Sequence, residues 1–188
     1  MSKDRKLERA YSLNVARLSL GKHEETFDIG EAFFTWFDSS LAEGGKGTFK
    51  LEIEKFGTHL DVHFHFSGRL PLNCDRCNER YEQDLSHDYR IIYSFDKDMD
   101  FEGYEVMFTD SGESQLNLMQ EFFDIISMAI PIRKVPPKEI HLCAPEILAM
   151  LGLDENGDPI QATDKTDQAD EPIDPRWEAL RKLKGDTD

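Results

Sequence analysis

The sequence lacks any long apolar run. No stretch approaches the roughly 18 consecutive apolar residues that a membrane-spanning helix requires. The first ten residues, Met1 to Ala10, are charged and contain no apolar core of the kind found in a secretory signal peptide. These two absences argue against membrane insertion and export. We therefore expect a soluble, cytoplasmic protein without a membrane partner.

Cysteine is scarce, with three residues in a chain of 188. An odd number of cysteines in a chain without an export signal is not typical of a disulfide framework. Reduced thiols or metal ligands are therefore the better interpretations of these residues.

The common catalytic motifs are also missing. The sequence contains no nucleophile elbow with a Ser-His-Asp set, no His-Glu-x-x-His and no dinucleotide-binding fingerprint. The glycine-rich segment 43–47 lacks the spacing and the Gly-Lys-Ser/Thr ending of a phosphate-binding loop. Acidic residues occur throughout the chain, so no pair of carboxylates stands out as a general acid and base. We therefore expect a protein that is not an enzyme and has no small-molecule substrate.

Positive charge is in deficit. The chain has 38 Asp and Glu residues against 22 Lys and Arg residues, which gives a formal net charge of −16 at pH 7. Nonspecific nucleic-acid binding depends on Lys and Arg side chains that neutralise phosphates, so extensive RNA binding is disfavoured. A basic protein partner fits the charge better, although such acidity also serves simply to keep a protein soluble.

Alternating apolar and polar residues predict an antiparallel sheet. Residues 49–54 and 59–66 alternate with a period of two around a predicted turn at 56–58, and residues 81–95 predict another long strand. Strands with one apolar and one polar face are typical of an antiparallel sheet that is covered on one side. Shorter strands are expected over three further ranges: 11–15, 26–29 and 104–108.

Three segments predict helices. A short helix is expected to start near Gly30, and apolar spacing predicts a helix over residues 116–129 that ends before Pro131. A third helix is expected from Pro145 to Leu151, ended by Gly152. The predicted fold class is α+β: an antiparallel sheet that could close into a barrel, two or three helices and an acidic, disordered C-terminal tail.

The domain organisation follows from the change in composition near the C-terminus. Residues 1–153 are expected to form a single α+β domain, and residues 154–188 an acidic linker with a short amphipathic segment. Residues 154–174 hold eight acidic residues and one Lys, with little apolar content, which predicts disorder.

The amphipathic segment that follows the linker is a candidate docking element. Asp174 suits the N-cap of a short helix and Pro175 its first position. A single apolar stripe would then be formed by Trp177, Leu180 and Leu183. Such a segment can pack on its own domain or on a partner protein, and Trp177 is therefore a candidate partner contact.

Cys74 and Cys77 form the clearest candidate site. Two thiolates at Cys-x-x-Cys spacing can hold one Zn²⁺ from a tight turn, and a tetrahedral site needs two further ligands. His141 and Cys143 are the candidates for these ligands, which gives a set of three sulfurs and one nitrogen. The alternative interpretation is that the thiols are reduced, partly buried and structural, with no metal.

A thiol-redox role is a further alternative. Redox Cys-x-x-Cys motifs lie at a helix N-terminus that follows a strand, where the thiol pKa falls. Here a strand-like segment follows the cysteines, which disfavours this role. Arg76 and Arg80 would lower a thiol pKa, but that supports metal binding equally. A second histidine-rich candidate, typical of a solvated strand face rather than of a metal site, comprises His59, His63 and His65.

Several segments resemble one protein family. Residues 70–77, Leu-Pro-Leu-Asn-Cys-Asp-Arg-Cys, resemble the Cys-x-Arg-Cys signature of the YceD family, the large ribosomal RNA subunit accumulation proteins. Residues 121–131 resemble the acidic and apolar helix of that family, and residues 174–183 resemble its terminal motif. Many members have a second cysteine pair, with which His141 and Cys143 roughly align. Of that second pair, this chain keeps only Cys143.

The resemblance implies a non-enzymatic role in the accumulation of large-subunit rRNA. It also implies a link to ribosomal proteins, because family genes often neighbour the gene of a small basic large-subunit protein. Our hypothesis is that the acidic body holds a ribosomal protein or a large-subunit assembly intermediate. Any direct RNA contact is expected to be limited to Arg76 and Arg80. The alternative function is a small zinc-binding interaction module unrelated to ribosomes.

Overall fold

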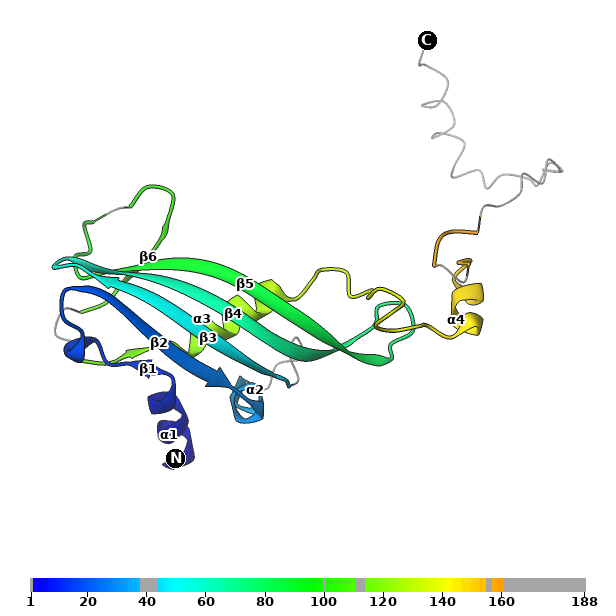
Figure 1. Cartoon of the computed structure of the whole chain (residues 1–188), viewed down its shortest axis with the longest axis horizontal. Helices are drawn as coiled ribbons and strands as arrows, with labels where there is room; N and C mark the ends of the chain where they lie inside the picture. The colour runs from blue at the N-terminus through cyan, green and yellow to red at the C-terminus, as the bar shows by residue number, and fades with distance from the viewer. Residues whose placement is uncertain (1, 38–43, 100, 111–113, 155–156, 161–188) are drawn as a thin grey trace, which may run out of the picture. The chain divides into compact units, whose positions relative to one another are not determined.

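A computed structural model describes residues 2–37, 44–99, 101–110, 114–154 and 157–160 of the chain. The chain divides into two units, Met1–Ile147 and Leu148–Asp188, and the first contains the sheets and the core (Figure 1). Most of the predicted acidic tail, with Trp177, lies outside the described residues. The boundary expected after residue 153 stays a prediction.

The main sheet has five strands in sequence order, so each strand pairs with its neighbours along the chain. The first four strands are antiparallel, as expected, but the last pair is parallel, which makes the sheet mixed. The first and last strands lie at opposite edges and do not pair, so the expectation of a barrel was wrong. The strands are β2 (Gly21–Ile29), β3 (Lys46–Lys55), β4 (His59–Asn73), β5 (Arg80–Ser94) and β6 (Glu105–Phe108).

The described residues form four α-helices rather than the two or three expected. The additional helix is at the N-terminus, where a mostly charged sequence contributes one partly buried apolar side chain, Leu7, to the core. The predicted strand at 11–15 shortens to two residues, because Asn14 caps a 3₁₀ turn at Val15–Arg17. The remaining elements are α1 (Ser2–Ala10), β1 (Ser12–Leu13), α2 (Glu31–Phe37), β7 (Leu116–Asn117), α3 (Met119–Ala129) and α4 (Pro145–Met150).

The core lies between one face of the main sheet and α3. The alternation of apolar residues places every second side chain of β3 and β4 on this face. Phe122 of α3 is fully buried there, with its ring stacked on that of Phe49 at 4.3 Å and tilted against that of Phe27 at 5.2 Å. Burial of one Phe side chain stabilises the fold by about 1.5–3 kcal/mol, so this helix fixes the position of the segment that follows it.

Two paired glycines make room for one of these aromatic rings. Gly47 of β3 lies opposite Gly68 of β4, and Phe66 is buried beside them. A Cβ atom on Gly68 would lie 2.7 Å from the Phe66 ring and 2.8 Å from the Lys46 carbonyl oxygen. The absence of both side chains therefore allows the Phe66 ring to lie across the two strands.

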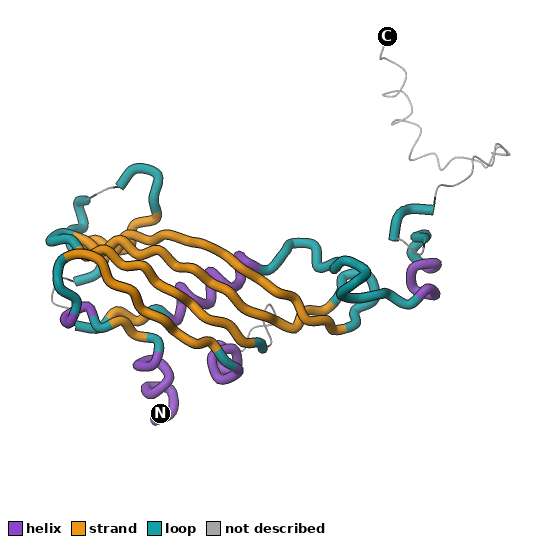
Figure 2. The backbone as a smooth tube through the Cα atoms, viewed as in Figure 1, coloured by secondary structure: helices purple, strands orange, loops and turns teal. Residues whose placement is uncertain are grey.

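Strands β4 and β5 continue beyond the rest of the sheet. The first residue of β3, Lys46, pairs with Arg69, whereas the β4–β5 pairing runs on to Asn73 and Arg80. The two strands thus form a ribbon whose end carries the cysteine turn, and the chain after α3 returns to this end (Figure 2). The candidate site is therefore built from the tip of the ribbon and a loop distant from it in sequence.

Candidate metal centre

The turn between β4 and β5 brings two sulfurs to one side. The Cys74 N–H donates to the Glu79 carbonyl at 2.9 Å, and the Asn78 N–H donates to the Cys74 carbonyl at 2.8 Å. Asn78 has a φ of 58°, in the left-handed region that Asn tolerates better than most residues. These bonds close the Cys-x-x-Cys segment so that Cys77 turns back toward Cys74.

The loop that follows α3 is bonded to this turn. The Asp75 N–H donates to the Lys134 carbonyl at 2.9 Å, and the Lys134 N–H donates to the Asp75 carboxylate at 2.6 Å. Farther along the loop, the His141 N–H donates to the Pro137 carbonyl, and the His141 ring stacks on Tyr81 with the centroids 5.9 Å apart. The loop is thereby held where it can supply two more ligands.

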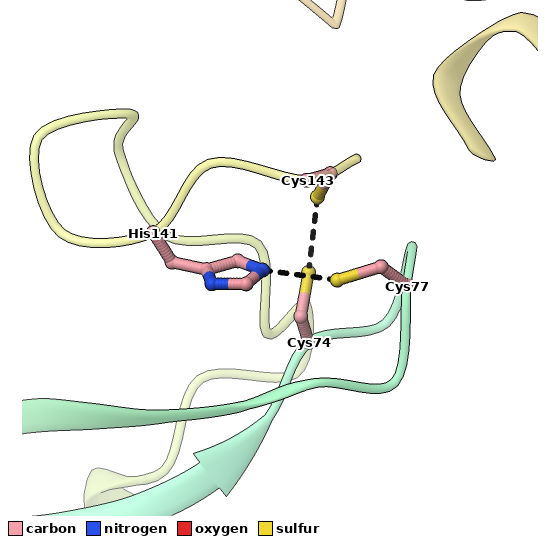
Figure 3. A group of neighbouring side chains, drawn as sticks. All are labelled: Cys74, Cys77, His141 and Cys143. Atoms are coloured by element: carbon pink, nitrogen blue, oxygen red, sulfur yellow. Dashed lines mark hydrogen bonds between the residues drawn. The ribbon is translucent and has the colours of Figure 1, made fainter. Parts of the chain in front are cut away.

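The four predicted ligands do come together. One potential ligand atom from each of Cys74, Cys77, His141 and Cys143 lies within 4.8 Å of all the others (Figure 3). The two buried sulfurs, of Cys74 and Cys143, are 3.7 Å apart. The Cys77 sulfur and the His141 Nε2 are 2.9 Å apart and share a hydrogen bond. Residues separated by more than sixty positions therefore form one compact group.

The donor set and its spacing suit zinc. In a tetrahedral site with Zn–S near 2.3 Å and Zn–N near 2.0 Å, neighbouring ligand atoms are about 3.5–3.8 Å apart. The Cys74–Cys143 sulfur distance of 3.7 Å falls in this range. The distance of 2.9 Å between the Cys77 sulfur and the His141 Nε2 is below the range, and the upper bound of 4.8 Å for the four ligand atoms is above it, each by about 1 Å or less. Three sulfurs and one nitrogen complete a four-ligand site, which is typical of structural zinc.

The pKa values of two of the thiols are shifted in opposite directions. Burial opposes ionisation of Cys74, but the N–H groups of Cys77 and Arg76 and the adjacent thiols outweigh it, so the pKa of Cys74 is lowered. Burial and hydrogen bonds with Cys77 and Cys74 raise the pKa of Cys143 to about 12. Cys74 is therefore easier to ionise than Cys143, and a bound dication would favour the thiolate form of the buried Cys143.

Other predicted contacts lie beside this group. Arg76 is half-buried between the two cysteines of the turn, and Arg80 is exposed at the start of β5. Sequence reasoning missed Glu79, whose carboxylate lies 3.8 Å from the His141 Nε2, and the pairing of Asp75 with Lys134. No motif signals these contacts, because each joins residues whose proximity depends on the folded loop.

The three strand histidines form no comparable group. His63 faces the Asp61 carboxylate at 3.7 Å, and His65 is hydrogen-bonded to Asp88 at 2.9 Å. His59 is hydrogen-bonded to Thr58. Among the described residues, the only set of three or more side chains positioned to share a metal ion is the Cys/His group.

Membrane insertion by a helix finds no support in the part of the chain that the structure describes. None of the helices there combines the length and the apolar character that crossing a bilayer requires.

Comparison with known proteins identifies the family. The family model described as large ribosomal RNA subunit accumulation protein YceD matches residues 62–184, which is more than half of the 188-residue chain. The chain belongs to the YceD family. The resemblance read from the sequence is thus confirmed, and the YceD match includes all four residues of the Cys/His group. No curated protein and no solved structure gives a significant match.

Proposed function

We propose that this YceD-family chain is a non-enzymatic, cytoplasmic accessory factor that supports the accumulation of large-subunit rRNA. It acts by holding a basic ribosomal protein or an assembly intermediate. The family match carries this proposal, because the family is described by its effect on large-subunit rRNA.

The charge of the chain supports a protein rather than an RNA as the main partner. A net charge of −16 repels phosphate, whereas it attracts the Lys- and Arg-rich proteins that ribosomes contain. Direct RNA contact is confined to the neighbourhood of Arg76 and Arg80, and no small-molecule substrate or membrane is involved.

Zinc is the second part of the proposal. Cys74 and Cys77, at the ribbon tip, and His141 and Cys143, in the returning loop, hold one Zn²⁺ in a closed structural site. When bound, the ion joins two segments that are otherwise linked by a few hydrogen bonds. The 4.8 Å grouping of the four ligand atoms supports this assignment.

Metal analysis of the purified chain separates zinc from thiol-redox chemistry. One tightly held zinc per chain is expected after purification without added metal, because a closed four-ligand site excludes other ligands. A metal-free protein whose thiols cycle reversibly with a disulfide partner would support the redox alternative instead.

Affinity capture at physiological salt tests the partner. The full chain is expected to recover a basic large-subunit protein both before and after ribonuclease treatment, because the contact is between proteins. Capture of naked RNA without any ribosomal protein would contradict the proposal.

A further inference from the structure

Strand β5 has a long edge that the fold leaves open. Strand β6 pairs only with Ile91–Ser94, the last four residues of β5. From Arg80 to Arg90, β5 pairs with β4 on one side and with no described strand on the other. Figure 1 shows this part of β5 along the border of the sheet, where β6 does not reach. Beside β5, the place of a neighbouring strand is therefore occupied only along Ile91–Ser94.

The register shows which backbone groups point outward. In an antiparallel pair, alternate residues exchange hydrogen bonds with the partner strand and the others direct their N–H and C=O groups away from it. The bonds from Cys74 N–H to Glu79 and from Phe95 N–H to Thr58 show that odd-numbered residues of β5 face β4. On the β6 side, the Thr109 N–H donates to the carbonyl of Ser94, so this even-numbered residue points away from β4, as the register requires.

The outward groups are consequently those of the even-numbered residues. These residues are Arg80, Glu82, Asp84, Ser86, Asp88 and Arg90. The parallel pairing of Ile91 with Glu105 uses the Arg90 carbonyl, and the Asp84 carbonyl accepts a bond from the Gln83 side chain. From Arg80 to Asp88 no described strand pairs with this side of β5, so an extended peptide could pair with the outward groups there.

The side chains along this edge define what such a peptide would carry. Glu82, Asp84 and Asp88 are exposed on the solvent face between Arg80 and Arg90; Asp84 also pairs with Arg69, and Asp88 with His65. Opposite-charge neighbours across a strand pair are favourable, so Lys or Arg suits the positions opposite these three acids. Tyr81 and Leu85 are buried on the other face, toward the core. A complementary strand therefore has Lys or Arg opposite the acidic residues and apolar residues in the alternate positions.

The opposite edge of the sheet is protected in a way that this one is not. On β2, Glu25 pairs with the buried Leu51 and so lies on the core face of an edge strand. A charged side chain on the inner face is a common device that prevents strand addition. The corresponding face of β5 carries Tyr81 and Leu85 instead.

We propose that the β5 edge from Arg80 to Arg90 binds an extended basic segment of a partner protein as an added strand. The segment alternates Lys or Arg with apolar residues. This inference deepens the proposed function and rests on it for the partner being ribosomal, but the binding mode is tested with the chain alone.

The probe is an eleven-residue synthetic peptide that alternates Lys and Val. Its control carries N-methyl groups on the residues that would donate to the edge, which removes strand pairing and keeps the charge. We expect the first peptide to bind and to slow hydrogen exchange at the amides of Glu82, Ser86 and Asp88. Equal binding of the N-methylated peptide would overturn the proposal, as would unchanged exchange at these amides.

Two variants of the full chain sharpen the test. Glu82→Lys, on the open edge, should weaken peptide binding about fivefold by replacing an attractive cross-strand pair with a repulsive one. Glu24→Lys makes the same charge change on the solvent face of β2 and should leave binding nearly unchanged. Equal weakening by both variants would show attraction to overall acidity and would overturn the proposal.

A third variant addresses the backbone directly. Ser86→Pro removes an N–H that the sheet does not use and places a ring on the open side. Loss of peptide binding with an unchanged unfolding temperature is expected. If this variant fails to fold, the exchange and Glu82→Lys results still decide the question. Edge amides protected without peptide, in a concentration-dependent dimer, would identify a second copy as the occupant and overturn the proposal.

Failure here is distinguishable from failure of the proposed function. If the peptide binds at the edge but depletion of the protein leaves rRNA unchanged, the binding mode is supported and the ribosomal role is contradicted. An rRNA defect on depletion, with no edge binding, would do the reverse.

Discussion

Replacement of Cys143 by Ser is the most informative single change at the Cys/His group. Cys143 is buried, and its sulfur lies 3.7 Å from that of Cys74. A Ser hydroxyl is a much poorer zinc ligand than a thiolate, so the variant keeps two sulfurs and the imidazole. It tests whether the loop after α3 is held to the ribbon by a metal ion.

The expected magnitude follows from ligand linkage. Zinc at 1,000 times its dissociation constant stabilises the folded chain by about 4.1 kcal/mol, and a hundredfold loss of affinity removes about 2.7 kcal/mol of that. For a chain of this size, 1 kcal/mol shifts the unfolding temperature by about 2–4 °C. The zinc-dependent rise in unfolding temperature should therefore fall by about 5–11 °C in Cys143→Ser.

The assay is thermal unfolding of the full chain with zinc and with a chelator. The difference between the two conditions cancels any cost of the substitution itself. Glu24→Gln is the control, because Glu24 lies on β2, outside the Cys/His group and the contacts that hold its loop, and its zinc-dependent rise should match that of the wild type. An equal rise in Cys143→Ser, or no rise in the wild type, would refute the assignment.

Three further predictions concern the fold. Phe122→Ala should lower the free energy of unfolding by about 3–5 kcal/mol in chemical denaturation, because its ring is fully buried against four others; a cost below 1 kcal/mol would mean that α3 is not packed there. Gly68→Ala should cost about 1–3 kcal/mol in the same assay, since its Cβ would overlap the Phe66 ring and the Lys46 carbonyl. Burial raises the pKa of Glu121, so its ionisation costs stability as pH rises above the ordinary Glu range. Glu121→Gln, which keeps an oxygen for the Tyr93 hydroxyl, should therefore raise the unfolding temperature at pH 7 and not at pH 4; a gain of the same size at both pH values would contradict this.

The predictability of the fold differed between its parts for physical reasons. The long strands and α3 were predicted correctly, because one face of each is buried and the apolar period records that burial. Helix α1 was missed because its charged sequence carries no apolar stripe. The parallel pairing of β6 was also missed, since it depends on how the chain crosses after β5 and not on the local pattern.

The candidate site shows the same division. The proximity of the four Cys and His side chains was predicted correctly, because sulfur and imidazole are rare in this chain and their chemistry is distinctive. The contacts that bring them together, Asp75 with Lys134 and Tyr81 with His141, join segments far apart in sequence and carry no motif. The open edge of β5 could not be predicted at all, because its extent depends on where β6 begins to pair with β5.

Depletion of the protein from growing cells tests the central claim most directly. The measured quantity is the amount of mature large-subunit rRNA relative to small-subunit rRNA, with the native chain restored as the control. The account predicts that this ratio falls on depletion and recovers with the native chain. An unchanged ratio in cells that lack the protein would contradict the proposed function.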